Sequence, residues 1–317
     1  MADGISRKQL NGAPIFAAYD PAALTAMRSK RCSSVLVLGT NLSAIDLAKS
    51  ALRYGNRVVL ASPSGQLPSV RTNLCRLDQL STMGKMPDPM RSAFDFLNAS
   101  SSTDRLLDRS AKILSKGEVF ASSAIELLEL ELHEALVGSD EWQDYVGPFI
   151  DWANLFWPLL DQERRKELKI TLDTRLSRYI SAIPVESAIE LINAAQQSRL
   201  FIQSEPLEFS HLNDAWHVTF EDGEEDFDLI VQAMGNLATQ WSFDSNAILS
   251  TNVGDKLRIG ADLRVANCSM PVWGVGAVTS DTFPIVNYIR AIVLQVGLVV
   301  SDLTHYRVPL HTGVDAV

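Results

Sequence analysis

The pattern of apolar and polar residues predicts strands at both ends of the chain and helices between them. A short apolar run from Ser33 to Gly39 is followed by a helical stretch through Leu52 and by the run RVVLA at 57–61. This order of strand, helix and strand is typical of a parallel βαβ unit. The strand pattern returns later in the chain, at 199–203, 207–211, 215–220 (after a turn at Asn213 and Asp214) and 228–235.

The long middle segment, residues 73–198, shows almost no strand pattern. Its apolar residues recur at helical spacing in four stretches, 90–97, 106–114, 124–137 and 185–195. Near the C-terminus, PVWGVGAV at 271–278 predicts a further strand that enters a glycine turn, and residues 285–302 predict a helix with one apolar side. Together these elements predict an α/β fold: a Rossmann-like, doubly wound parallel sheet with a large all-helical insertion.

The expected domain organisation follows from these boundaries. Residues 1–31 are polar and irregular and are interpreted as an N-terminal arm. Residues 32–72 and 199–303 form the Rossmann-like domain, in which 271–303 also joins the sheet. Residues 73–198 form the helical insertion subdomain, and residues 304–317 are a C-terminal tail.

Composition narrows the function without naming it. The chain has 46% hydrophobic and 21% charged residues and a formal charge of −10, without a basic run. This balance is that of a globular protein and disfavours nucleic acid as a partner. No apolar run is long enough to span a bilayer, and the first residues lack the apolar core of a leader. We therefore expect a cytoplasmic protein that does not associate with membranes.

Cysteine and histidine positions give no metal pattern. Cys32, Cys75 and Cys268 lie far apart in the sequence and are expected to be reduced. The five histidines show no metal-ligand spacing, so no metal site is expected. Hydrolase and kinase motifs are also missing.

The turn after the first strand carries the first candidate chemistry. In VLVLGTNLSAIDLA, residues 35–48, Gly39, Asn41 and Ala44 occupy the three positions of a G-x-G-x-x-G dinucleotide fingerprint. Gly39 allows a tight turn, Ala44 allows close helix packing, and a helix N-terminus attracts a pyrophosphate. Asn41 tolerates positive φ, but its side chain stands where a phosphate approaches. Both a cofactor site formed by Gly39, Thr40, Asn41, Leu42 and Ser43 and a purely structural turn remain open.

The end of the second strand bears on which cofactor is bound. A carboxylate there bonds a ribose 2′-hydroxyl, but Ala61 and Ser62 occupy the position. Ser62, Ser64 and the more distant Arg71 suit a 2′-phosphate and favour NADP, although a solvated surface loop fits equally well. Two later glycine turns extend the candidate cofactor site, with Gly235 in one and Gly274 and Gly276 in the other.

These stretches resemble the bacterial two-dinucleotide FAD/NAD(P)-binding oxidoreductases. The second nucleotide module of that family typically contains VLVLGTGLTAVD and then SRRGLLP, which match VLVLGTNLSAID at 35–46 and SPSGQLP at 62–68. Further similarity lies in residues 152–168, in DLIVQAMGN at 228–236 and in VWGVGAV at 272–278, so the likeness spans about residues 20–303 in patches.

The resemblance implies NADP or FAD as cofactor, with three departures. The family's N-terminal FAD module is expected to be missing, because fewer than 20 residues precede the likeness. The middle glycine of the turn is Asn41, and the paired arginines of the following loop are Pro63 and Ser64. The resemblance therefore implies a shortened relative in which a separate flavoprotein supplies the flavin or a nicotinamide acts directly.

Other residues have weaker patterns. Asp281, Thr282 and Tyr288 follow the last glycine turn and are either catalytic or helix-capping. The basic residues Arg164, Arg165, Lys166, Arg175 and Arg178 favour a solvated helix surface over an anion site. The aromatic residues Trp152, Phe156 and Trp157 have helical spacing, which favours a place in a core over the lining of a ligand cleft.

Two hypotheses follow for the function. The first is an NAD(P)- or FAD-binding oxidoreductase that acts on a small organic substrate under the helical subdomain, with a flavoprotein or a second copy of the chain as partner. The second is a non-redox descendant of the fold, a scaffold, a partner subunit or a cofactor-independent enzyme that binds no nucleotide. No catalytic residue is identified.

Overall fold

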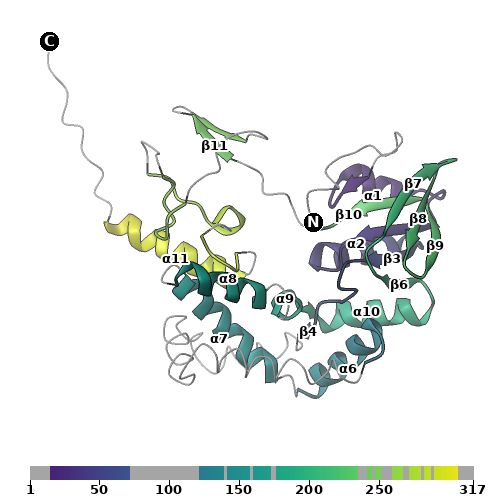
Figure 1. Cartoon of the computed structure of the whole chain (residues 1–317), viewed down its shortest axis with the longest axis horizontal. Coiled ribbons are helices and arrows are strands. Elements are labelled where there is room, and N and C mark those ends of the chain that lie inside the picture. The colour runs from purple at the N-terminus through teal and green to yellow at the C-terminus, as the bar shows by residue number, and fades with distance from the viewer. Residues whose placement is uncertain are drawn as a thin grey trace, which may run out of the picture. The chain divides into compact units, whose positions relative to one another are not determined.

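The fold is taken from a computed structural model, and Figure 1 shows the course of the chain. The described residues are 15–71, 121–138, 141–157, 160–172, 176–234, 241–244, 247–250, 259–266, 271–279, 282–286 and 289–305. The helices predicted at 90–97 and 106–114 lie outside these ranges. The chain divides into two compact units. Unit 1 comprises Met1–Met86, Ser102–Val146 and Ile170–Asn236, and unit 2 comprises Pro87–Ser101, Gly147–Lys169 and Leu237–Val317.

Unit 1 is built on a five-stranded sheet in which all neighbouring strands are parallel. Its order is β1 (Phe16–Ala17), β10 (Leu229–Gln232), β2 (Ser34–Leu38), β3 (Arg57–Ala61) and β6 (Leu200–Gln203). From β2 the chain proceeds to β3 and β6 on one side, whereas β10 is added on the other. Such a reversal of strand order leaves a crevice at the carboxyl ends of the strands. The predicted α/β fold with a Rossmann-like parallel sheet is confirmed.

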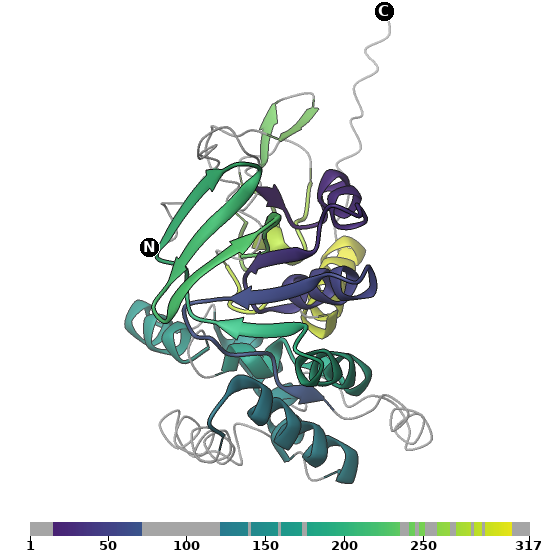
Figure 2. The same cartoon turned by 90° about the vertical axis from the view of Figure 1, so that its right-hand side faces the viewer.

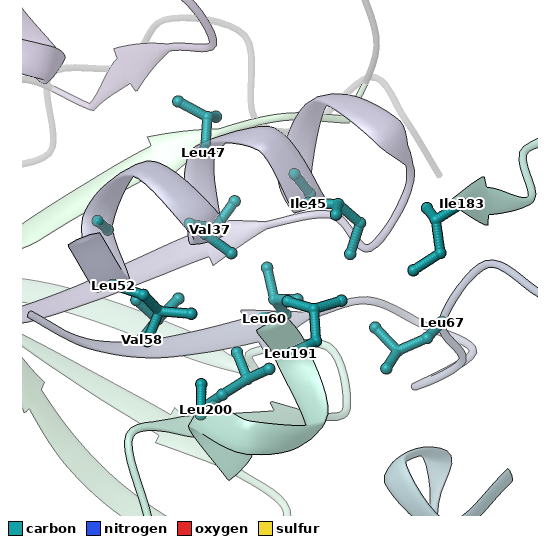
Figure 3. Close-up of a cluster of buried hydrophobic side chains, with 14 of the residues drawn as sticks. Val37, Ile45, Leu47, Leu52, Val58, Leu60, Leu67, Ile183, Leu191 and Leu200 are labelled. Atoms are coloured by element: carbon teal, nitrogen blue, oxygen red, sulfur yellow. The ribbon is translucent and has the colours of Figure 1, made fainter. Parts of the chain in front are cut away.

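One face of this sheet is covered by helices. In β2, Val35 and Val37 point to this face, because alternate side chains of a strand lie on opposite sides. They pack with residues of α1 (Pro21–Met27), α2 (Leu42–Arg53) and α10 (Val185–Gln196). Figure 3 shows part of this core, with side chains of α2 and α10 lying together with those of β2, β3 and β6.

The other face of the sheet is covered by an antiparallel sheet instead of helices. Strands β7 (Glu208–Leu212), β8 (Ala215–Phe220) and β9 (Gly223–Phe227) form it, as Figure 2 shows. Leu36 and Leu38 of β2 pack there against every second residue of β8. The predicted turn between β7 and β8 is confirmed: Asn213 and Asp214 have φ of 54° and 64°, as the tight turn of a two-residue hairpin requires.

The N-terminal segment differs from the expected irregular arm. Within residues 1–31, β1 pairs with β10 and α1 packs its Ala23 and Met27 into the core of unit 1. The side chain of Asp20 accepts a hydrogen bond from the Ala22 amide and caps α1. The prediction was wrong because a strand of two residues and a helix of seven residues are too short to show a clear periodicity of apolar residues.

The described part of the middle segment, from residue 121 to 198, is mainly helical. The prediction of a helix at 124–137 is confirmed by α6 (Ala124–Val137), which begins after the cap Ser123 and ends at Gly138 with φ of 75°. Further along lie α7 (Glu141–Phe156), α8 (Gln162–Thr171) and α9 (Ser177–Ile180). Two short strands, β4 (Val70–Arg71) and β5 (Ile183–Pro184), pair in parallel.

Unit 2 contains the hairpin of β11 (Trp241–Asp244) and β12 (Ala247–Ser250), the 3-10 helix η3 (Gly276–Thr279) and α11 (Ile289–His305). The strand predicted at 271–278 was wrong. Trp273 makes only an isolated bridge with Arg264, and the chain then enters η3. The alternating pattern could not distinguish a strand from an extended loop, and none of the described residues of 271–303 joins the central sheet.

Candidate functional site

The turn between β2 and α2 follows the carboxyl end of β2, where the strand order of the central sheet reverses. The Gly39 amide donates to the Ala61 carbonyl at 2.7 Å, and the Ala233 amide donates to the Leu38 carbonyl at 2.8 Å. Gly39 has φ of +125°, and a Cβ placed on it would lie 2.6 Å from the Ala233 carbonyl oxygen. This turn therefore requires glycine, both for its backbone conformation and for its approach to β10.

Asn41 is the N-cap residue of α2. Its φ of −81° is not positive, so the turn does not need the left-handed conformation that Asn tolerates. The side chain is exposed and makes no capping hydrogen bond, and the first turn of α2 carries no acidic residue. The partial positive charge of the helix N-terminus is thus not offset by its own residues. Leu42 is exposed and Ser43 is half-buried beside it.

Ala44 completes the fingerprint on the inner side of the helix. Its side chain is fully buried in the core between α2 and the sheet. A methyl group is small enough for α2 to lie close to β2. The first position of the fingerprint thus forms a tight glycine turn, and the third holds a small buried side chain.

Three hydroxyl groups connect the turn to the loop after β3. Thr40 is 6% exposed, and its Oγ1 donates to Ser62 Oγ at 3.2 Å. Ser62 Oγ lies 3.4 Å from Ser64 Oγ, and the Ser62 amide donates to the Gln203 carbonyl of β6. No carboxylate stands at the end of β3. Because Ser64 is exposed, this row of hydroxyls runs from the buried turn to the surface.

Arg71 has a different partner from the one expected. Its guanidinium donates to the Ala182 carbonyl, through Nε at 2.7 Å and also through Nη2. The contact holds β4 beside the segment that enters β5. Nothing in this geometry brings Arg71 to the hydroxyls of Ser62 and Ser64, so the structure supports a role in packing for this side chain.

The remaining candidate glycines are Gly235, Gly274 and Gly276. Gly235 lies outside the described residues, and Gly274 and Gly276 belong to unit 2. Gly274 packs closely, since a Cβ there would lie 2.5 Å from Ile259 Cδ1. Gly276 has φ of +74°, and its amide donates to Gln295 Oε1 at 2.7 Å.

Gln295 is a residue whose role the sequence did not reveal. It is 1% exposed, accepts the bond from Gly276 and donates through Nε2 to Thr279 Oγ1 at 2.9 Å. It therefore fixes the glycine turn of unit 2 from within α11. The sequence feature that could have revealed this role is a single amide side chain among the apolar residues of the predicted helix. Of the other candidates nearby, Asp281 and Tyr288 lie outside the described residues, and Thr282 donates to the Ile259 carbonyl.

The structure shows which of the basic and aromatic residues of the middle segment are exposed and which are buried. Arg164 is exposed, as predicted, and Arg175 lies outside the described residues. Arg178 was predicted on a solvated surface and is instead 6% exposed, paired with Glu131. Its α9 lies in a tight connection before β5, where helical spacing alone does not show which side is covered. The aromatic prediction is confirmed for Trp152 and Trp157, which are buried, whereas Phe156 is half-buried.

The described residues hold no group of three metal-ligating side chains from His, Cys, Asp and Glu. Within the same part of the chain, no helix has the length and apolar character to cross a bilayer.

Comparison with known proteins gives distant structural likenesses. No protein-family model matches the chain, and no curated protein matches it. Among solved structures, it is similar to the ornithine N-hydroxylase of Kutzneria sp. 744, solved with reduced FAD, NADP+ and L-ornithine (11% identity, TM-score 0.38, 90% of this chain and 55% of that one).

Two further structures are similar at the same level. One is the L-lysine 6-monooxygenase of Pseudomonas syringae, with 15% identity and a TM-score of 0.37 over 89% of this chain and 56% of that one. The other is the reduced ornithine hydroxylase of Pseudomonas aeruginosa, with 11% identity and a TM-score of 0.40 over 92% of this chain and 61% of that one. The chain spans between 55% and 61% of the length of these three proteins.

Proposed function

We propose that the chain binds NADP in the turn between β2 and α2 and takes part in an oxidoreductase reaction on a small organic substrate. The observation that carries the proposal is the backbone conformation of Gly39 and its close approach to Ala233. Its conformation and the absence of a side chain bring the turn within van der Waals distance of Ala233, at the point where the strand order reverses. Dinucleotides bind at this place in parallel α/β sheets.

The residues around the turn fit the parts of a dinucleotide. The first-turn amides of α2, at Leu42 and Ser43, would donate to the pyrophosphate, since no side chain caps them and no acidic residue repels the anion. Asn41 lies at the edge of this position with an exposed side chain that can turn away. The bound cofactor would supply hydride transfer, and the protein would supply binding and orientation.

The preference for NADP over NAD rests on the loop after β3. A carboxylate at the strand end would accept a bond from the ribose and repel a 2′-phosphate, and none is present. The hydroxyls of Ser62 and Ser64 are donors that suit a phosphate oxygen. A flavin would be held by a separate flavoprotein or by further protein sequence, and the helical segment would cover the substrate.

A direct test is equilibrium binding. The protein as purified would be examined for flavin absorbance, and NADPH, NADH and FAD would then be titrated against it by calorimetry. The proposal expects NADPH to bind more tightly than NADH. If neither nicotinamide nucleotide binds at millimolar concentration, the proposed function is wrong.

A non-redox scaffold is the second candidate, and Asn41 is the observation that favours it. An amide side chain replaces the glycine at which a pyrophosphate usually approaches the backbone. A crystal grown with saturating NADPH that shows only the Asn41 side chain and water at the α2 N-terminus would support this candidate.

A further inference from the structure

Thr40 connects two parts of the candidate site that lie on different strands. It follows Gly39 in the turn after β2, and its side chain points toward the loop after β3, where Oγ1 donates to Ser62 Oγ at 3.2 Å. A threonine in an exposed turn usually bonds to water or to nearby backbone. Here the side chain is 6% exposed and its partner is 22 residues away in the sequence.

The direction of this bond determines what Ser62 can do. A hydroxyl has one proton and two lone pairs. Since Thr40 donates to Ser62, one lone pair of Ser62 Oγ is occupied, and the Ser62 proton must point to another acceptor on the outer side. Ser64 Oγ lies there at 3.4 Å, and either hydroxyl of that pair can be the donor. Hydrogen bonds in such a row strengthen one another, because each accepted bond makes the next hydroxyl a better donor.

The backbone holds Ser62 in this position. Its amide donates to the Gln203 carbonyl of β6 at 3.3 Å, and the preceding Ala61 carbonyl accepts the Gly39 amide at 2.7 Å. The turn of Thr40 and the strand end of Ser62 are thereby joined through the main chain as well as through the side chains. Removal of the Thr40 hydroxyl would therefore free the Ser62 hydroxyl to rotate while the backbone stays in place.

We infer that Thr40 is a positioning residue for selectivity between the two nicotinamide nucleotides: by donating to Ser62 it directs the Ser62 proton toward a 2′-phosphate. This inference rests on the proposed function. A charged phosphate oxygen gains more from a directed donor than a neutral 2′-hydroxyl does, because hydrogen bonds to ions are roughly twice as strong. Thr40 thus acts on NADPH through Ser62 and has little effect on NADH.

The test compares four proteins by calorimetric titration with NADPH and NADH: wild type, Thr40→Val, Thr40→Ser and Thr25→Val. Thr40→Val has nearly the same shape and lacks the donor. We expect it to weaken NADPH binding about fivefold, as for the loss of one hydrogen bond, and to change NADH binding less than about twofold. Thr40→Ser keeps the hydroxyl that Thr40→Val lacks, and it is expected to bind NADPH with the wild-type affinity.

Thr25→Val is the control for the substitution itself, because Thr25 is an exposed residue of α1 whose Oγ1 donates to the Pro21 carbonyl. It is expected to leave both affinities unchanged. A double variant, Thr40→Val with Ser62→Ala, should bind NADPH no more weakly than Ser62→Ala alone.

The two proposals fail in different ways. If wild type binds neither nucleotide, the proposed function is wrong and this inference with it. If wild type binds NADPH and Thr40→Val keeps the same ratio of NADPH to NADH affinity, or Thr40→Ser fails to restore it, Thr40 has no role in selectivity while the cofactor proposal stands.

Discussion

The guanidinium of Arg178 binds both carboxylate oxygens of Glu131, with Nη1 to Oε1 at 2.6 Å and Nη2 to Oε2 at 3.2 Å. Both side chains are buried, and Arg178 Nε donates further to the Leu67 carbonyl. The pair thus joins α6, α9 and the loop before β4. Burial raises the pKa of the Glu131 carboxyl, and Arg178 opposes that rise.

Removal of one partner of this pair should destabilise unit 1 strongly. Arg178→Ala leaves the Glu131 carboxylate buried without its partner, which costs about 3 to 5 kcal/mol of unfolding free energy. Urea unfolding followed by circular dichroism would measure it. Arg164→Ala, which affects an exposed ion pair with Asp161, is the control and should change stability by about 1 kcal/mol or less. Equal effects of the two variants would show that the buried pair has no special importance.

Gly39→Ala is expected to combine backbone strain with a steric clash. The added Cβ meets the Ala233 carbonyl oxygen at 2.6 Å in a backbone conformation that alanine rarely adopts, so the free energy of unfolding should fall by about 3 kcal/mol. Gly55→Ala is the matched control, because Gly55 has φ of +92° and open space around it. That variant should lose only about 1 kcal/mol from strain. A loss at Gly39 no larger than that at Gly55 would contradict the close approach of the turn to β10.

Asn41→Gly is predicted to improve nucleotide binding. The variant removes the side chain beside the α2 N-terminus at a cost of a few tenths of a kcal/mol in helix capping. NADPH affinity, measured by calorimetry, should rise by about tenfold, since a phosphate can then approach the amides directly. Asn41→Ser serves as the comparison, because serine caps helices well and keeps a side chain. An affinity that stays at the wild-type level in Asn41→Gly would place the phosphates elsewhere.

Asp228 should make stability depend on acid pH. Its partial burial opposes ionisation, but four hydrogen bonds from the amides and hydroxyls of Ser33 and Ser34 outweigh this and hold the pKa of Asp228 below its ordinary value of 3.8. A lowered pKa means that the folded state binds the proton less readily than the unfolded state. The stabilisation is therefore complete above about pH 4 and is lost as the pH falls below it.

The measurement is the urea midpoint between pH 6 and pH 2 for wild type and Asp228→Asn. Over the acid part of this range the wild-type midpoint should fall more steeply than that of the variant, whose side chain does not titrate. Parallel curves would mean that Asp228 contributes nothing through its charge.

The thiol of Cys32 should be slow to react. Burial, and secondarily the negative charge of Asp228, raise its pKa to about 11. In a variant with Cys75→Ser and Cys268→Ser, reaction with Ellman's reagent at pH 8 should be about a hundredfold slower in the native protein than in urea, since only the thiolate reacts. A native rate close to the rate in urea would contradict the raised pKa.

The sequence predicted those elements whose ends carry their own signals. The helix at 124–137 has its observed boundaries because Ser123 and Gly138 cap it, and the strands at 57–61 and 215–220 follow clear apolar patterns. The antiparallel sheet over the central sheet could not be placed, because alternation shows that one side of β8 is buried and does not show against what.

The site was predictable only within one local segment. Gly39 and Ala44 could be recognised because the fingerprint fixes their spacing along the chain. The contact between Thr40 and Ser62 depends on the pairing of β2 with β3, which brings together residues that no local pattern relates. Arg178 was misplaced for the same reason, since its partner Glu131 lies 47 residues away.

The position of β10 between β1 and β2 sets the order in which this sheet can be completed. During synthesis, residues 16–17 emerge more than 200 residues before 229–232, and residues 34–38 emerge about 190 residues before them, so β1 has no neighbour to pair with until then. Until β10 is synthesised, the edge of β2 that faces away from β3 has no strand paired with it, and β10 then inserts between β2 and β1. Because long-range pairings of this kind form slowly, ribosome-bound chains that end before residue 229 should expose this unpaired edge of β2 to chaperones.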